Sequence, residues 1–142
     1  MNTLEAIEPA KQTQNGENVL RLPYGLLGFE KVKNYALISR PHEEPFLWLQ
    51  MLDEGRHAFL ILSPSVAVPD YRPDISEAEV KFLELTTPDD ALVFNIVTLR
   101  ANGPATINLK GPLIVNRYTR VGKQVIPNNA AQYAVSYPLP VS

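Results

Sequence analysis

The side chains best suited to acid–base chemistry are three pairs of adjacent carboxylates: Glu43-Glu44, Asp53-Glu54 and Asp89-Asp90. Glycoside hydrolases use two carboxylates that flank one substrate bond at a fixed separation. Adjacent residues of an extended chain point to opposite sides, so no pair supplies that geometry by itself. All three pairs lie beside turn signals, and we interpret them as solvated charge at turns.

Two histidines could hold a metal ion or assist a serine nucleophile, but their surroundings argue against both roles. His42 lies in a polar segment and His57 at the entry to an apolar run, without a second ligand at helical or strand spacing. The chain has no cysteine, which excludes disulfides and thiolate metal sites. No nucleophile elbow, phosphate loop or dinucleotide fingerprint occurs. We therefore expect no metal, no cofactor and no catalytic residue, and we predict that the protein is not an enzyme.

A group of basic residues in the C-terminal third could contact nucleic acid. Its members are Lys110, Arg117, Arg120 and Lys123, with Tyr118 as a side chain that could stack on a base. The alternative is an edge strand whose positive charge prevents association with other chains. Because the net charge is −2, which is unusual for a dedicated nucleic-acid binder, we expect no direct contact with nucleic acid.

Two segments join an apolar run to a break made of glycine and proline. They are residues 22–30, which read LPYGLLGFE, and residues 107–116, which read INLKGPLIVN. Proline fixes one backbone angle, whereas glycine allows angles that a side chain would forbid. Among these residues Glu30 is the only candidate acid or metal ligand, and this favours a binding protein over an enzyme. We expect the fold to depend on Pro23, Gly25, Gly28, Phe29 and Pro112.

The elements that carry these segments belong to one domain. A chain of 142 residues with 45% hydrophobic content can bury a core without disulfides. Residues 1–18 are polar without a sustained period, and we expect an N-terminal arm there, followed by the domain over residues 19–142. The N-terminus lacks an apolar core of signal-peptide length, and no stretch has the apolar length of a membrane span. We therefore expect a cytoplasmic protein without membrane contact.

Short apolar runs predict many strands and few helices. The strands are expected over residues 19–22, 35–39, 46–52, 58–62, 91–99, 107–109, 112–116 and 134–137. The runs 107–109 and 112–116 form either a strand pair or one strand bulged at Gly111. Both faces of the run 46–52 are apolar, which indicates burial on both sides or a sheet curled on itself. A hairpin is expected over residues 118–126, with its turn centred on 121–123.

The 13 prolines fit short elements joined by tight turns, because proline is poorly tolerated inside helices and central strands. The fold class is therefore all-β, a barrel or sandwich with one small helix. That helix is expected over residues 77–85, with Ser76 as its cap and Glu79 completing a capping box. Phe82 allows two interpretations: it borders one wide buried face, or it stays partly exposed as a contact for a partner.

The two glycine-proline segments resemble those of the flagellar assembly factor FliW family. The first matches the signature of that family in Leu22-Pro23-Tyr24-Gly25-Leu26-Leu27-Gly28-Phe29-Glu30, and the second is similar over residues 108–116. The similarity continues through residues 122–126 to Tyr137-Pro138-Leu139, so it covers about residues 19–139. The departures are the longer polar arm, Gly111 where the family often has alanine, and Ser136-Tyr137 where it usually carries arginine.

The resemblance implies a small β-barrel-like, non-catalytic protein that binds flagellin in the cytoplasm and also binds the translational regulator CsrA. Export of flagellin would free the protein to bind CsrA and relieve its repression of flagellin translation. We expect a monomer. The alternative is a small RNA-binding β-barrel protein that uses the basic residues described above.

Candidate contacts with these partners are Glu43, Glu44, Asp53, Glu54, Phe82, Asn108 and Asn116. The acidic residues would repel RNA phosphates over about 8–10 Å at physiological salt. The two asparagines could pair with the backbone of a partner, or they could satisfy turns of their own chain.

Overall fold

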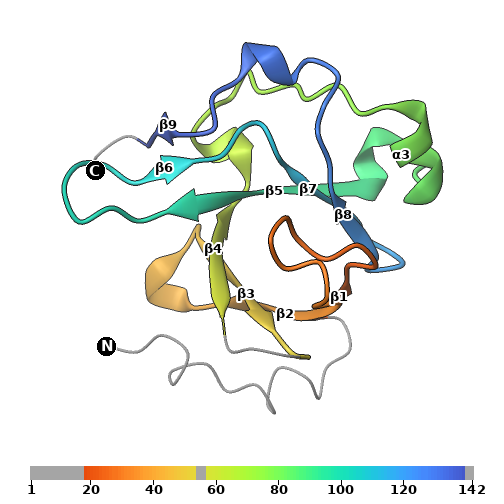
Figure 1. The fold of residues 1–142 in the computed structure, drawn as a ribbon, viewed down its shortest axis with the longest axis horizontal. Coiled ribbons are helices and arrows are strands. Elements are labelled where there is room, and N and C mark those ends of the chain that lie inside the picture. The colour runs from red at the N-terminus through yellow and green to blue at the C-terminus, as the bar shows by residue number, and fades with distance from the viewer. Residues whose placement is uncertain (1–17, 54–56, 140–142) are drawn as a thin grey trace.

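The computed structural model describes residues 18–53 and 57–139, and the expected arm over residues 1–18 lies outside this range except for its last residue. Antiparallel strands make up most of the described fold (Figure 1). They are β1 (Val19–Arg21), β2 (Asn34–Ser39), β3 (Leu47–Met51), β4 (Ala58–Leu62), β5 (Ala91–Thr98), β6 (Thr106–Ile107), β7 (Leu113–Asn116), β8 (Gly122–Gln124) and β9 (Tyr137–Pro138). One α-helix, α3 (Glu77–Phe82), and short 3₁₀ turns complete the described part.

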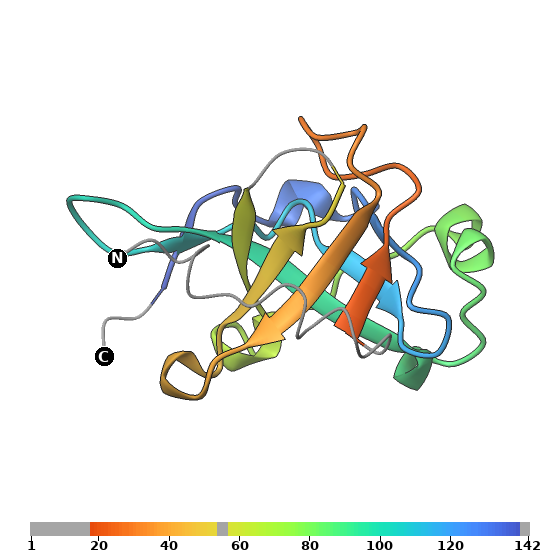
Figure 2. The same cartoon turned by 90° about the horizontal axis from the view of Figure 1, so that it is seen from below.

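The strands form one sheet that curls back on itself. Consecutive strands pair from β1 to β5, and the row continues through β6 to β9. Figure 2 shows the first strands of this row side by side, from β1 in red onward. Strand β5 also pairs through its first half with β7, which in turn pairs with β8. The expected all-β fold with one short helix is therefore confirmed.

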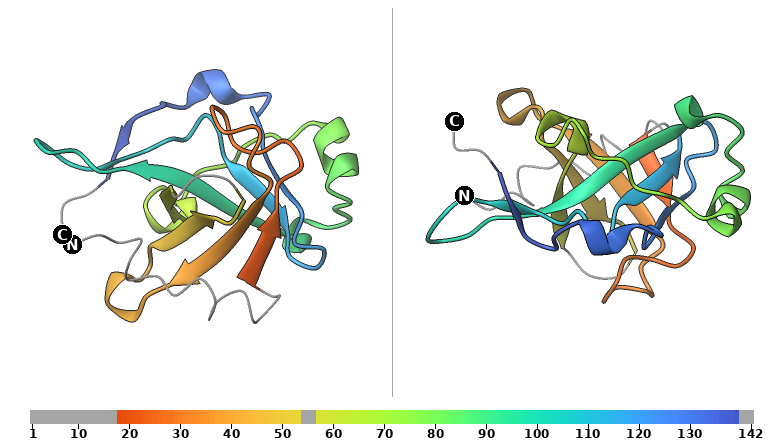
Figure 3. Two further views of the ribbon diagram at one scale, coloured as in Figure 1. Left: turned by 60° about the horizontal axis from the view of Figure 1, so that its bottom comes forward. Right: turned by 90° about the horizontal axis from the view of Figure 1, so that it is seen from above.

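The curled sheet comes close to a barrel without closing. Strand β8 returns to β1 through a single parallel bridge between Arg21 and Val121. One backbone hydrogen bond accompanies it, from Arg21 N to Arg120 O at 2.9 Å. Both panels of Figure 3 show β5 as a long strand that crosses the molecule, with α3 near its beginning. Loop 22–33 and strand β8 are thus neighbours, although about 100 positions separate them in the chain.

Strand β3 is packed on both faces, as the apolar run predicted. Leu49 and Met51 belong to the main core, which also contains Leu20, Leu22 and Leu113. The side chain of Trp48 packs on the opposite side with Ala36 and Ile38. The abundant prolines take positions that suit their fixed angle, because three 3₁₀ turns begin with proline at 41, 64 and 88.

Helix α3 begins where the sequence predicted but ends earlier. The side chain of Ser76 accepts a hydrogen bond from Glu79 N at 3.3 Å. The helix stops at Phe82, and Glu84 takes a left-handed backbone angle of 57°. The second half of the expected capping box is absent among the contacts described, because the Glu79 carboxylate binds Lys123 Nζ at 2.7 Å instead. A long-range ion pair has replaced a local bond.

The hairpin of β7 and β8 turns earlier than predicted. The turn lies over residues 117–120, where Arg120 has a φ angle of 64°, and Gly122 lies inside β8. A Cβ atom at position 122 would lie 2.8 Å from Val115 Cγ2 and 2.9 Å from Leu22 Cδ2. Glycine is required there because β8 packs closely on its neighbours. The last strand also differs, since β9 is Tyr137–Pro138 and Ala134 contributes only a carbonyl to Leu109 N.

Candidate functional site

The first glycine-proline segment folds into a double turn that separates two adjacent leucines. Gly25 has a φ angle of 65°, and a Cβ atom there would lie 2.4 Å from Phe29 O. Gly28 has a φ angle of 89°, and its amide donates to Glu30 Oε2 at 3.0 Å. This backbone hydrogen bond holds the pKa of Glu30 below its usual value.

The double turn buries Leu26, which is 2% exposed, and leaves Leu27 80% exposed. Phe29 fixes the end of the turn, because its ring packs against Phe59 with the centroids 5.2 Å apart. The double turn therefore leaves the side chain of Leu27 facing solvent, while Leu26 joins the main core.

The second segment is held from inside the sheet. Asn108 O accepts a hydrogen bond from the buried Asn95 side chain at 2.7 Å, and Asn108 Oδ1 accepts one from Lys110 N at 2.9 Å. Lys110 Nζ donates to Ala130 O at 3.0 Å and thereby ties this segment to the 3₁₀ turn η5 (Ala130–Gln132). Pro112 is buried, and its carbonyl accepts from Val125 N at 2.9 Å.

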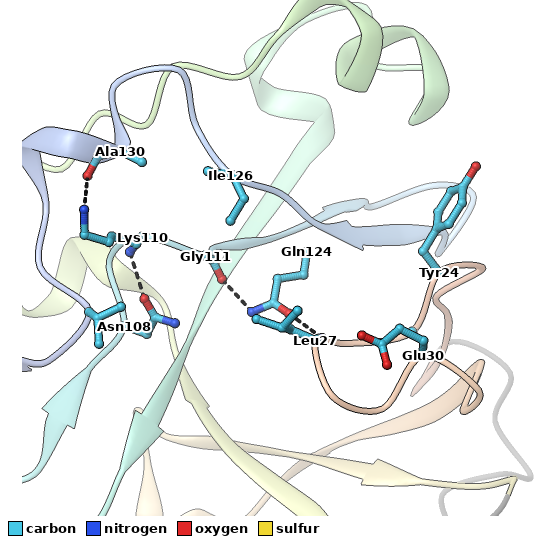
Figure 4. Close-up of a pocket in the computed structure, with 11 residues that line it drawn as sticks. Tyr24, Leu27, Glu30, Asn108, Lys110, Gly111, Gln124, Ile126 and Ala130 are labelled. Atoms are coloured by element: carbon cyan, nitrogen blue, oxygen red, sulfur yellow. Dashed lines mark hydrogen bonds between the residues drawn. The ribbon is translucent and has the colours of Figure 1, made fainter.

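The side chain of Gln124 joins the two segments. Its Oε1 accepts a hydrogen bond from Leu27 N at 2.9 Å, and its Nε2 donates to Gly111 O at 3.1 Å (Figure 4). Strand β8 supplies this residue, which lies opposite Leu113 of β7. Both glycine-proline segments therefore meet at one amide group.

A groove of about 470 Å³ opens where the segments meet. It is lined by Tyr24, Gly25, Leu27, Glu30, Asn108, Lys110, Gly111, Gln124, Ile126, Ala130 and Val135 (Figure 4). Four of its apolar side chains are strongly exposed: Leu27 at 80%, Ile126 at 70%, Tyr24 at 57% and Val135 at 56%. Such a gathering of exposed apolar side chains around a hollow marks an interaction site.

Helix α3 extends the apolar rim through Phe82. The Phe82 and Tyr24 rings lie 5.3 Å apart, and Lys123 Nζ lies 4.8 Å from the Tyr24 centroid and 5.5 Å from that of Phe82. The ammonium group also binds Glu79, as described above. Phe82 is 36% exposed, so the interpretation of a partly exposed ring fits its position. Its role as a partner contact stays a prediction.

Two of the acidic candidates, Glu43 and Asp53, do not belong to the groove lining and make bonds within the chain. Glu43 accepts from Trp48 Nε1 at 2.7 Å and pairs with Arg40 at 3.3 Å. Asp53 accepts from the backbone amides of Lys33 and Asn34 and from the Asn34 side chain. Partial burial opposes ionisation of Asp53, but these hydrogen bonds outweigh it and lower its pKa.

Glu44 is exposed, and no bond from its side chain to another described residue is found. Glu54 lies outside the described residues. Glu43, Glu44 and Asp53 therefore do not line the groove, and the proposed action of the acidic candidates on RNA stays a prediction.

The two asparagine candidates occupy different environments. Asn108 lines the groove, although its side-chain oxygen is already bonded to Lys110 N. Asn116 is 3% exposed and uses both ends of its amide: Nδ2 donates to Leu83 O at 2.9 Å, and Oδ1 accepts from Tyr118 N at 2.8 Å. For Asn116 the alternative of a satisfied turn matches the geometry, because a buried and fully bonded amide cannot reach a partner.

The residues that form the groove wall were largely missed by sequence reasoning. Tyr24 and Leu27 lie in a segment whose glycines and proline were expected to set the path of the backbone. Ile126 and Val135 were expected to lie in a hairpin and a strand. Gln124 gave no signal, because its bonds reach Leu27 and Gly111 far away in the chain. The available hint was the pair of adjacent leucines between two glycines, since a tight turn cannot bury both.

The basic residues do not form one free surface. Lys123 is paired with Glu79 and Lys110 is bonded to Ala130 O, whereas Tyr118 is 73% exposed beside the exposed Arg117. Among residues 18–53 and 57–139, no group of three or more histidine, aspartate or glutamate side chains could hold a metal ion. No helix within the same residues has the length and apolar character needed to cross a bilayer.

Comparison with known proteins gives a consistent set of relatives. The family model described as FliW protein matches residues 4–139. The flagellar assembly factor FliW of Leptospira biflexa is 40% identical over 114 residues, which are 79% of this chain and 74% of that protein. The FliW of Treponema denticola is also 40% identical over 114 residues, with coverage of 80% and 77%. A crystal structure of a flagellar assembly factor FliW matches with a TM-score of 0.80 at 27% identity and covers 90% of both chains.

Proposed function

Because the chain belongs to the FliW family of flagellar assembly factors, we propose that it binds the translational regulator CsrA and flagellin in the cytoplasm. Binding to CsrA would relieve the repression of flagellin translation, and binding to flagellin would withdraw the protein from CsrA. The proposal describes a binding protein rather than an enzyme. Its action needs mutual exclusion of two partners and no reaction.

The observation that carries the proposal is the groove between the two glycine-proline segments. The segments that resemble the family are the ones that build it, through Tyr24 and Leu27 on one side and Gly111 on the other. Its four strongly exposed apolar side chains would lose their contact with water when a partner covers them. Removal of apolar surface from water is the main favourable term in most protein association.

The chemistry of the groove suits a protein surface better than a small polar metabolite. Its charged lining residues are Glu30 and Lys110, and Lys110 already donates to Ala130 O. Two of the uncharged polar side chains in the lining, Asn108 and Gln124, bind backbone atoms of the chain itself. Apolar contact, rather than convergent polar groups, therefore dominates what the groove offers a ligand.

A matched pair of leucine substitutions tests the proposal. Leu27→Asp places a carboxylate in the groove, whereas Leu99→Asp places one at a 67% exposed leucine that is not part of the groove lining. Burial of a leucine contributes about 1.5–3 kcal/mol, so Leu27→Asp should weaken binding by about tenfold or more. Calorimetric titration with purified CsrA and with purified flagellin measures both affinities.

Three outcomes separate the parts of the proposal. If the unmodified protein binds neither CsrA nor flagellin, the proposed function is wrong. If it binds but both leucine variants have the same affinity, the partners dock outside the groove. If it binds RNA directly, with an affinity that falls steeply with salt, the alternative of an RNA-binding protein is favoured.

A further inference from the structure

We propose that Gln124 is a positioning residue that latches loop 22–33 to the second glycine-proline segment and so sets the shape of the groove. The part of this inference that concerns partner affinity rests on the proposed function. The part that concerns the loop rests only on contacts within the chain. Gln124 touches the backbone of both segments and thereby acts on a partner through Leu27.

The latch needs a side chain that donates and accepts at the same time. Gln124 Oε1 accepts from Leu27 N, and Gln124 Nε2 donates to Gly111 O (Figure 4). An amide is the uncharged side-chain group that offers an acceptor and a donor on one carbon. A carboxylate would keep the acceptor but would place a second oxygen against the Gly111 carbonyl, which lies 3.1 Å from the present nitrogen.

Gln124 belongs to the strand that forms one side of the groove, and this strand is part of the sheet. Gln124 lies in β8, which pairs with β7 and packs closely on Leu22 and Val115 through Gly122. Gly111 leaves room for the amide end, because a Cβ atom at that position would lie only 3.1 Å from Gln124 Nε2. The sheet therefore fixes the position of the amide, and the loop is the part that adapts to it.

The loop has few other bonds that orient its tip. The other bonds of the backbone around Leu27 stay within the loop. Gly25 N donates to Leu22 O, Phe29 N donates to Leu26 O, and Gly28 N donates to Glu30 Oε2. Leu26 anchors the loop in the core, but its burial does not specify where the 80% exposed Leu27 points. Among the described contacts, the bond to Gln124 is the one that ties the Leu27 backbone to the opposite wall of the groove.

The two hydrogen bonds of Gln124 therefore fix the position of the Leu27 backbone in the groove before a partner binds. A contact surface that is already ordered loses less conformational entropy when it binds than one that must be ordered in the complex. Without the latch, Leu27 would sample several directions, and a partner would have to select the productive one. The structure assigns this preparatory role to one side chain outside both segments.

The test compares Gln124→Met with Gln132→Met. Methionine keeps the length and shape of glutamine but removes both hydrogen bonds. Gln132 is exposed in η5, and no hydrogen bond from its side chain to a described residue is found, so it provides a matched control. Amide hydrogen exchange followed by NMR reports the protection of Leu27 N–H directly, and calorimetric titration with CsrA and flagellin reports affinity.

Loss of one hydrogen bond of about 1 kcal/mol should speed exchange at the Leu27 amide about fivefold to tenfold in Gln124→Met. Exchange of the β3 amides should stay unchanged, which shows that the fold is intact. Affinity for a partner should fall about tenfold, whereas Gln132→Met should behave as the unmodified protein. Gln124→Glu should also lose Leu27 protection, because repulsion between its second oxygen and Gly111 O would move the carboxylate away from the position that Leu27 N needs.

Unchanged exchange at Leu27 in Gln124→Met would overturn the latch, whatever the partners do. Full protection of Leu27 in Gln124→Glu would overturn the two-armed form of the proposal. Faster exchange with unaltered affinity would overturn the positioning role in binding. If the unmodified protein binds neither partner, the proposed function fails, and the exchange measurements still decide whether the latch exists.

Discussion

Replacement of Asn116 by alanine should destabilise the fold more than any ordinary surface change, although a partner contact was one of the two interpretations of this residue from the sequence. Asn116 Nδ2 donates to Leu83 O at 2.9 Å and to Glu84 O at 3.3 Å. Its Oδ1 accepts from Tyr118 N at 2.8 Å and Thr119 N at 3.1 Å. One amide thus joins the end of α3 to the turn between β7 and β8.

The expected cost follows from which partners are buried. Leu83 is 1% exposed, and its carbonyl would lose a partner inside the protein, at a cost of about 1–3 kcal/mol. The amides of Tyr118 and Thr119 lie in exposed residues, so water can replace Oδ1, and the net loss there is about 1 kcal/mol for each bond. Together these terms give about 3–5 kcal/mol for Asn116→Ala, a large share of the 5–15 kcal/mol that is roughly typical of a domain.

Urea denaturation measures this loss. A decrease of about 3 kcal/mol lowers the midpoint by about 1 M or more, at slopes of about 1–3 kcal/mol per molar urea. Asn102→Ala is the matched control, since Asn102 is exposed in the loop between β5 and β6. That control should stay within about 0.5 kcal/mol of the unmodified protein.

Asn116→Asp separates the two ends of the amide. A carboxylate still accepts from Tyr118 N and Thr119 N, but its second oxygen faces Leu83 O without a proton to donate. Protonation of that second oxygen at low pH would restore a donor toward Leu83 O. The deficit of Asn116→Asp should therefore shrink as pH falls from neutral. A loss below about 0.5 kcal/mol for Asn116→Ala would refute the reasoning, because it lies within the range of ordinary surface substitutions.

Two further predictions concern the turns. Gly25→Ala should lower the free energy of unfolding, measured by urea denaturation, by at least about 2 kcal/mol, because the left-handed angle of 65° is strained for alanine and its Cβ atom would lie 2.4 Å from Phe29 O. Gly28→Ala is the control and should lose less stability, because a Cβ atom there would meet nothing within 4 Å. Equal losses in the two variants would contradict the clash at Gly25. Hydrogen bonds from the Thr86 side chain and from the Thr86 and Thr87 backbone lower the pKa of Asp90 to about 2. This depressed pKa contributes stability above the unfolded pKa of about 4, which is lost as pH falls toward about 2. Asp90→Asn should therefore be less stable than the control Asp89→Asn at pH 7, and the difference in stability should disappear between about pH 4 and 2. A difference that does not change with pH would contradict the assignment of this stability to the ionised Asp90 carboxylate.

Local patterns in the sequence were sufficient to predict the central strands and the start of the helix. Continuous apolar runs located β2 to β5, since burial on one or both faces dictates those residues regardless of their distant neighbours. The start of α3 was also predictable, because Ser76 binds an amide only three residues away. The end of the helix was not predictable, since it depends on Leu83 docking in a cluster with Ile114 and Val125.

The groove could not be predicted because its geometry arises from contacts between distant segments. Glu79 had a plausible local partner in Ser76, yet Lys123, 44 positions away, takes its carboxylate. Gly122 had the appearance of a turn glycine, yet it is needed for the approach of Val115 and Leu22. In each case the local signal pointed to the right residue for a different reason, because contacts with distant segments determine what the residue does.

A single groove is enough to make the binding of two partners exclusive. Two proteins that both cover Leu27 cannot occupy it together, and this coupling is complete without any change in the protein. Partners on separate surfaces would instead require two states of this chain with different affinities for each partner. The contacts of loop 22–33 specify one arrangement, with Leu26 in the core and Leu27 bonded to Gln124. Shared use of the groove is therefore the simplest physical basis for the exchange between CsrA and flagellin that the proposed function requires.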